Sequence, residues 1–289
     1  MEAPAANTAP IGATWSSGVI ARWAPAPERT PLDAAAPGGG GPSLSPRPVA
    51  DVLDAIIISD LHLGCDSCQA KLLLALLECL LAGTIRTGRL IINGDGFDSF
   101  DFRRLRKNHW KVLSVIRRLS DKMEVIWTSG NHDGPAEIIS HLLGVQVREE
   151  FILTSGPQRV LVLHGDIFDD FIDRHPLITW GGDAIYNMLQ RVDRRHHIAR
   201  LAKSRSKLFL HCAAKVRQRA IQHARRRGCQ SVICGHTHQV AADIRGPIAY
   251  FNSGCWTELP PTYLTVRGGT VTVCRFQAGP SVTAWQPNG

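Results

Sequence analysis

Hydrophobic residues occur from residue 54 onward in short runs separated by longer amphipathic stretches. The runs 54–59, 89–92 and 123–128 are mostly apolar, as is typical of strands buried on both faces. Between them, 69–81 is apolar on nearly every helical face, and 105–119 has the spacing of an amphipathic basic helix. This order of strands and helices predicts parallel strands joined by right-handed crossovers.

The second half of the chain continues the alternation with one long interruption. A short helix is predicted near 135–143, and a long helical stretch is predicted at about 171–227. The remaining strands are predicted at 151–154, 159–163, 231–234, 247–252, 263–266 and 270–276. A sheet that is parallel early and hairpin-like late predicts two packed sheets between helices.

Composition sets the domain boundaries. The first fifty residues hold nine of the 17 prolines together with alanine and glycine runs, so we expect 1–50 to be a disordered tail and 51–289 to form one domain. No apolar run approaches the roughly 20 residues of a membrane-spanning helix. The start has no secretory signal and the eight cysteines are scattered, which favours a cytoplasmic protein.

Basic charge is concentrated in the expected helical insertion. Residues 191–227 carry thirteen Lys or Arg and one acid, whereas the whole chain has a net charge of +8. One interpretation is a solvated helix face. The other is a basic amphipathic cap that attracts phosphate or the anionic surface of the inner membrane, with Lys203, Arg205 and Lys207 as candidate substrate-binding residues. No nucleic-acid-binding motif accompanies the charge, so a nucleic acid partner is not expected.

Metal-ligating residue types follow five of the apolar runs. The five clusters are Asp60-Leu61-His62, Gly94-Asp95, Gly130-Asn131-His132-Asp133, His164-Gly165-Asp166 and Gly235-His236-Thr237-His238. Carboxylate and imidazole ligands without an obligatory thiolate suit Mn²⁺, which we favour, with Fe or Zn²⁺ as alternatives. Seven or more ligands are too many for one ion, so the sequence predicts two, with Asp95 as the bridging ligand.

In this order, the clusters resemble the motifs of the calcineurin-like metallophosphoesterases. The resemblance implies a four-layer α/β/β/α sandwich, here with a helical insertion. It also implies a metal-dependent hydrolase of phosphoric esters or pyrophosphates. One metal site would be formed by Asp60, His62, Asp95 and His238, and the other by Asp95, Asn131, His164 and His236. The catalytic pair would be His132, acting as an acid beside the metals, and Asp98, which orients it.

A finer resemblance is to UDP-2,3-diacylglucosamine diphosphatase. It rests on the phrases 59–64 and 94–98 and on a helical insertion between His164 and the last histidine pair. It implies hydrolysis of the pyrophosphate of a UDP-linked acylated sugar in lipid A assembly. Typical members carry Arg where this chain has His132. The alternatives are a phosphoesterase acting on a soluble nucleotide or phosphodiester, and a non-catalytic membrane-surface protein with the same fold.

Overall fold

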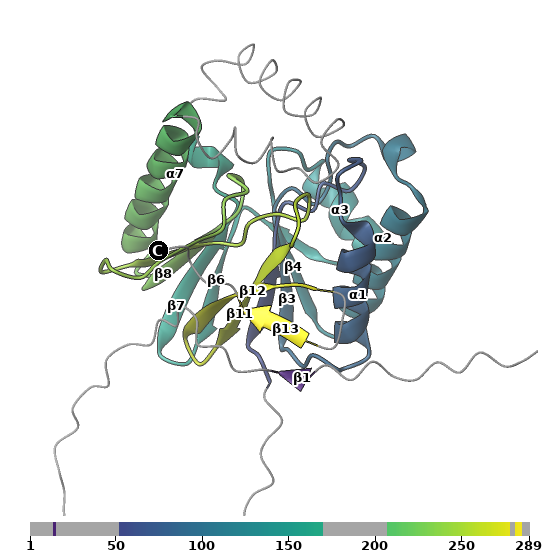
Figure 1. The fold of residues 1–289 in the computed structure, drawn as a ribbon, viewed down its shortest axis with the longest axis horizontal. Coiled ribbons are helices and arrows are strands. Elements are labelled where there is room, and N and C mark those ends of the chain that lie inside the picture. The colour runs from purple at the N-terminus through teal and green to yellow at the C-terminus, as the bar shows by residue number, and fades with distance from the viewer. Residues whose placement is uncertain (1–13, 16–51, 170–206, 278–280, 285–289) are drawn as a thin grey trace, which may run out of the picture.

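The computed structural model describes residues 14–15, 52–169, 207–277 and 281–284, which form two sheets with helices outside them (Figure 1). The first sheet has eight strands in the order β1-β13-β12-β11-β2-β3-β4-β5, and the second has five in the order β6-β7-β8-β10-β9. The strands of the first sheet are β1 (Thr14–Trp15), β2 (Ala55–Ile58), β3 (Arg89–Asn93), β4 (Glu124–Thr128), β5 (Gln146–Arg148), β11 (Thr262–Arg267), β12 (Thr270–Arg275) and β13 (Ser281–Ala284). Those of the second are β6 (Glu150–Ser155), β7 (Gln158–Leu163), β8 (Ser231–Cys234), β9 (Ala241–Asp243) and β10 (Ala249–Asn252). The helices are α1 (Ala70–Leu81), α2 (Lys107–Ser120), α3 (Ala136–Leu143), α7 (Lys207–Arg226) and the short 3-10 turns η1 (Phe102–Arg104) and η2 (Asp166–Phe168).

Alternation along the strands of the first sheet divides its side chains between two cores. In β2, Ile56 and Ile58 pack with the buried faces of α1 and α2, whereas Ala55 and Ile57 lie in the core between the sheets. All four residues are fully buried, which explains why the run is continuously apolar. The first sheet is therefore covered by helices on one face and by the second sheet on the other.

The second sheet divides its side chains in the same way. Val160 and Val162 of β7 belong to the core between the sheets, whereas Leu161 and Leu163 pack with Val216 of α7. In Figure 1, α1, α2 and α3 lie on one side of the molecule and α7 on the other. Three cores between four layers confirm the predicted α/β/β/α sandwich.

Parallel pairing brings the carboxyl ends of the central strands to one edge. The strands β2, β3 and β4 pair in parallel, as do β7, β8 and β10. Backbone hydrogen bonds then tie the following turns together. Asp60 N donates to Gly94 O at 3.1 Å, and Gly235 N donates to His164 O at 3.0 Å. The turns that carry the predicted ligands are therefore neighbours.

The expected elements of the described residues are present, with ends shifted by one or two residues, apart from the long helical stretch. The sequence did not predict β5, β9, β13, η1 or η2. These segments have three or four residues each and lack the continuous apolar run that marked β2 and β8.

Two expectations fall largely outside the described residues. Of the expected insertion at about 171–227, the structure describes α7, while Lys203 and Arg205 and the side chain of Lys207 lie outside. Of the expected disordered tail 1–50, the structure describes β1, which differs from the expectation by pairing in parallel with β13. Within the described part of the chain, no helix is long and apolar enough to span a membrane.

The core between the sheets generates a stability prediction. Ile57→Ala should lower the free energy of unfolding by about 2–5 kcal/mol, because the truncated side chain leaves a cavity between two rigid sheets. The control Val52→Ala, at a position that is 41% exposed, should change it by less than about 0.5 kcal/mol. Denaturant unfolding measures both, and equal losses would contradict the two-sheet core.

Candidate metal centre

Five of the seven predicted ligands occupy a backbone conformation that most residues avoid. Asp60, His62, Asp95, His236 and His238 have φ values of 52°, 46°, 50°, 63° and 57°. No other non-glycine residue in the described part of the chain has a positive φ. This left-handed conformation costs roughly 1–2 kcal/mol for each L-residue. Backbone strain is thus confined to five candidate ligands, as expected of a functional site.

Glycines before the ligands allow the turns to approach the carboxylates. A Cβ on Gly130 would lie 2.3 Å from Asp95 Oδ1, and one on Gly235 would lie 2.5 Å from Asp60 Oδ2. Any side chain there would displace a carboxylate. Gly130 and Gly235 are therefore needed for the close approach of one turn to the next.

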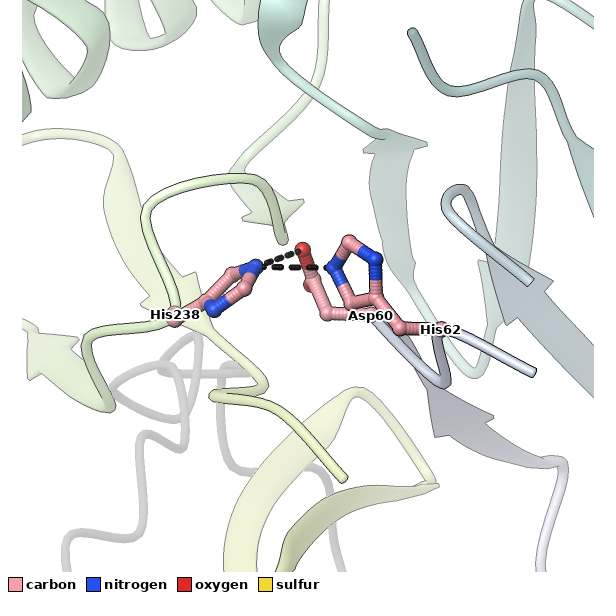
Figure 2. Close-up of side chains that lie close together, drawn as sticks. All are labelled: Asp60, His62 and His238. Carbon is pink, nitrogen blue, oxygen red and sulfur yellow. Dashed lines mark hydrogen bonds and ion pairs between the residues drawn. The ribbon is translucent and has the colours of Figure 1, made fainter. Parts of the chain in front are cut away.

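Asp60 is the centre of the first group of donors. Its fully buried carboxylate lies 3.1 Å from His238 Nε2 and accepts the backbone N–H of His236 at 3.0 Å. The Ser59 hydroxyl donates to the same carboxylate. Figure 2 shows His238 directed at both Asp60 and His62, whose Nε2 lies 3.0 Å from the Nε2 of His238. One carboxylate and two imidazoles therefore converge on one point.

Asp95 is the second buried carboxylate, with 2% of its surface exposed. Its Oδ2 lies 3.3 Å from His164 Nε2. The His164 Nδ1 donates to the carbonyl of Asn93 at 2.9 Å, and this bond directs Nε2 toward Asp95. Donor atoms of Asp60, Asp95 and His164 all lie within 4.8 Å of one another and form the second group.

Asp95 also belongs to a third group, with His62 and His132. Burial and, after it, His238 lower the pKa of His62 to about 3, so its imidazole is neutral at pH 7 and offers a lone pair. Burial opposes a charge on Asp95, but the neighbouring His164 holds the pKa of that carboxyl well below its ordinary value.

The pKa of His164 shifts in the opposite direction to that of His62. Burial alone would lower its pKa, but the Asp95 carboxylate raises it well above the ordinary value for histidine. Ligand imidazoles must be deprotonated, so the raised pKa of His164 means that protons compete with a metal ion for this ring.

The residues present fit two divalent ions. Carboxylate oxygens and imidazole nitrogens form three overlapping groups, and Asp60, His62 and Asp95 are each shared by two of them. A donor set of this composition suits first-row divalent metals. Of the predicted ligands, Asp60, His62, Asp95, His164 and His238 lie in these groups.

His132 and Asn131 lie exposed in the turn after β4. The His132 backbone N–H donates to Asp95 Oδ1 at 3.0 Å, and its Nδ1 donates to the Asp98 carbonyl at 2.9 Å. The Asp98 carboxylate pairs instead with Arg104 at 2.6 Å. The contact from Asp98 to His132 is therefore made by the backbone. The Asp98 carboxylate lies between Arg104 and His62, with Oδ1 3.7 Å from His62 Nδ1.

His236 lies beside the donor groups. Its ring packs edge-on against His164, with centroids 5.3 Å apart, and its Nε2 lies 3.1 Å from Asp169 Oδ2. Asp169 follows His164 closely in the sequence, but only the fold shows which histidine it contacts.

Asp133 is a structural residue to which the sequence analysis assigned no role. Its carboxylate accepts four hydrogen bonds and joins the turns after β3 and β4. The donors are Gly96 N, Phe97 N, Gly130 N and Trp127 Nε1, at 2.9–3.2 Å. Burial and, after it, the charge of Asp95 raise the pKa of Asp133 to about 6. Its position directly after Gly130-Asn131-His132 could have indicated an acid that closes this turn.

Asn252 fixes the turn that carries the two C-terminal histidines. Its Nδ2 donates to Gly235 O at 2.6 Å, and its Oδ1 accepts from Gly254 N at 2.9 Å. Asn252 is the last residue of β10, a strand expected from the sequence. Asparagine is common at strand ends, so the sequence pattern did not indicate that this side chain supports the histidine turn.

Backbone strain at the centre can be tested at His238. In the metal-free protein, His238→Gly should be more stable than His238→Ala by about 1 kcal/mol, because glycine adopts positive φ without penalty. At the exposed helical position Lys111 the order should reverse, with alanine more stable than glycine by about 1 kcal/mol. Chemical denaturation measures the four variants. The same order at both positions would contradict strain at His238.

Comparison with solved structures found chains of low sequence identity. A single mutant of Vps29 from Entamoeba histolytica has 16% identity and a TM-score of 0.43, covering 80% of this chain and 96% of that one. The phosphoesterase Yfce from E. coli has 16% identity and a TM-score of 0.42, covering 75% and 90%. An archaeal phosphodiesterase has 17% identity and a TM-score of 0.42, covering 77% and 99%. These values carry no inference about activity.

A comparison with proteins of curated function found no match. The family model for the calcineurin-like phosphoesterases matches residues 54–240, which is more than half of the 289 residues. The matched range contains every donor of the candidate metal centre and the strands that position them. The chain belongs to the calcineurin-like phosphoesterase family.

Proposed function

We propose that this protein is a dinuclear metal-dependent phosphohydrolase. The observation that supports it best is the overlap of the groups of metal-ligand atoms, in which the carboxylates of Asp60 and Asp95 each belong to two groups. A shared carboxylate suits two ions about 3.5–4 Å apart, an arrangement found in phosphatases and nucleases. The first site would use Asp60, His62 and His238 with Asp95. The second would use His164, Asn131 and His236 with Asp95.

When bound, such a pair of ions supplies Lewis-acid stabilisation of the attacking and leaving oxygens in an in-line displacement at phosphorus. The protein's own residues orient the donors and supply a proton. His132 Nδ1–H donates to the Asp98 carbonyl, which leaves Nε2 as the nitrogen that faces a substrate. Nε2 would give a proton to the leaving oxygen from the doubly protonated form of the ring, in which both nitrogens are donors. His132 is exposed, so a substrate can reach it.

For the natural substrate, we propose the pyrophosphate of a UDP-linked acylated sugar, with Mn²⁺ as the metal. The support comes from the phrases 59–64 and 94–98 and from the large apolar side chains of the sequence 171–189, which lies outside the described residues and would receive acyl chains. The basic residues Lys203, Arg205 and Lys207 would hold anionic headgroups at the inner membrane.

His132 favours a second candidate, a phosphoesterase acting on a soluble nucleotide or phosphodiester. Histidine at this place is typical of the broader superfamily, whereas the acyl-sugar enzymes carry arginine. A non-catalytic membrane-surface protein is the third candidate, and it would not need the donor groups to bind metal.

The role of Asp95 can be tested by one isosteric change. Asp95→Asn should lower turnover by at least about a thousandfold, because it removes the charge that both ions would share. The control Asp121→Asn, on an exposed acid at the end of α2, should retain activity. Steady-state hydrolysis of a phosphodiester with Mn²⁺ measures both. Full activity of Asp95→Asn, or of chelator-treated wild type, would contradict the mechanism.

The role of His132 can be separated from metal binding. His132→Ala should lower turnover by roughly a hundredfold while metal content stays unchanged, since a general acid is lost. The control His141→Ala changes an exposed histidine of α3 and should retain activity. The loss should shrink for substrates with good leaving groups. Loss of one ion from His132→Ala would identify it as a ligand instead.

A substrate panel tests the proposed function itself. It contains the UDP-linked diacylated sugar, its deacylated counterpart, a nucleotide and bis(p-nitrophenyl) phosphate, each with Mn²⁺. Faster cleavage of the acylated compound at the pyrophosphate would support the proposal. Equal cleavage of acylated and deacylated compounds would favour the soluble-substrate candidate, and no cleavage of any would favour the non-catalytic one.

A further inference from the structure

The carboxylate of Asp169 makes a buried contact with the side of His236 opposite Nδ1. Its Oδ2 lies 3.1 Å from His236 Nε2, and the two side chains are only 13% and 8% exposed. A carboxylate can only accept a hydrogen bond, so Nε2 is the donor. With little competing water, a hydrogen bond to a charged oxygen is stronger than a neutral one.

We propose that Asp169 is a positioning residue for His236. Its carboxylate holds the proton on Nε2 and fixes the ring, so that Nδ1 is the nitrogen available to a metal ion. This inference rests on the proposed function, in which His236 belongs to the second metal site. Carboxylates that hold the distal N–H of a ligand histidine typically change metal affinity by about 10–100-fold.

The main chain of His236 is already fixed independently of Asp169. Its N–H donates to Asp60 Oδ1 at 3.0 Å, and its φ is 63°. The preceding Gly235 donates to His164 O at 3.0 Å. What remains free is rotation of the imidazole about its side-chain bonds. The Asp169 contact on one side and the edge-on His164 ring on the other restrict that rotation.

The turn that carries Asp169 is held by α7. Arg219 of α7 donates to the carbonyl of Phe168 at 3.0 Å, and the Phe168 side chain is buried in the core beneath that helix. Asp169 N donates to Asp166 O at 2.8 Å, which closes the η2 turn. The Asp169 carboxylate also adds to burial in raising the pKa of Cys212 on α7. Asp169 therefore lies between α7 and the second metal site, on a supported turn.

The hydrogen bond is tested by NMR on the metal-free protein. Long-range ¹H–¹⁵N spectra at about pH 8, above the ordinary histidine pKa, report which nitrogen of His236 carries the proton. We expect Nε2 in the wild type and in Asp166→Asn, which removes a charge from the same turn. In Asp169→Ala the proton should distribute over both nitrogens. A proton on Nδ1 in the wild type, or an unchanged spectrum in Asp169→Ala, would overturn the proposal.

The isosteric variant Asp169→Asn covers the case in which Asp169→Ala does not fold. Its amide oxygen is a neutral acceptor, so the Nε2–H resonance of His236 should move upfield while the same nitrogen keeps the proton. An unchanged resonance in Asp169→Asn would count against the contact.

Titration with Mn²⁺ alone measures the consequence for metal binding. Calorimetry should show about 10–100-fold weaker binding at one site in Asp169→Ala, a smaller loss in Asp169→Asn and none in Asp121→Asn, which changes an exposed acid at the end of α2. Equal affinities in wild type and Asp169→Ala would overturn the positioning role. No Mn²⁺ binding to the wild type would overturn the proposed function instead, and the NMR result would still decide the hydrogen bond.

Discussion

Five left-handed residues at the candidate metal centre are the constraint on which the rest of the structure depends. At roughly 1–2 kcal/mol each, their strain approaches the net stability of a whole domain, about 5–15 kcal/mol. The backbone bonds from Asp60 N to Gly94 O and from His62 N to Asp95 O hold the turns in place at 3.1 and 3.0 Å. The three cores of the sandwich must offset the rest, which explains why the strands leading into the turns are buried on both faces.

The same turns bring two buried negative charges close together. Asp60 and Asp95 are both buried, and each carboxylate disfavours the charge on the other. In the metal-free protein, these carboxylates raise the pKa of His164 by favouring its protonated form. Divalent ions bound here would balance the negative charge of the two carboxylates better than a proton does, because each ion carries more positive charge. The fold and the chemistry are thus connected through one buried cluster of negative charge.

The sequence was sufficient for the parts of the protein that depend on local pattern. Strand runs such as 54–59 and 89–92 predicted the layers, and the residues that end those runs predicted Asp60 and Asp95. Short strands such as β5 and β9 were not predicted, because three residues are too few to show an alternation of apolar and polar side chains. Contacts between residues that are distant in the sequence were not predicted either. No pattern reveals that Asp98 meets His132 through its carbonyl, or that Asp169 reaches across to another strand's turn.

The central claim is that the shared Asp95 carboxylate belongs to a centre for two ions. The most direct measurement is the metal content of purified protein after Mn²⁺ loading and gel filtration, alongside Asp95→Asn. The account predicts two ions per wild-type chain and loss of both, or of their tight binding, in the variant. One ion or none in the wild type, or two tightly bound ions in Asp95→Asn, would contradict it.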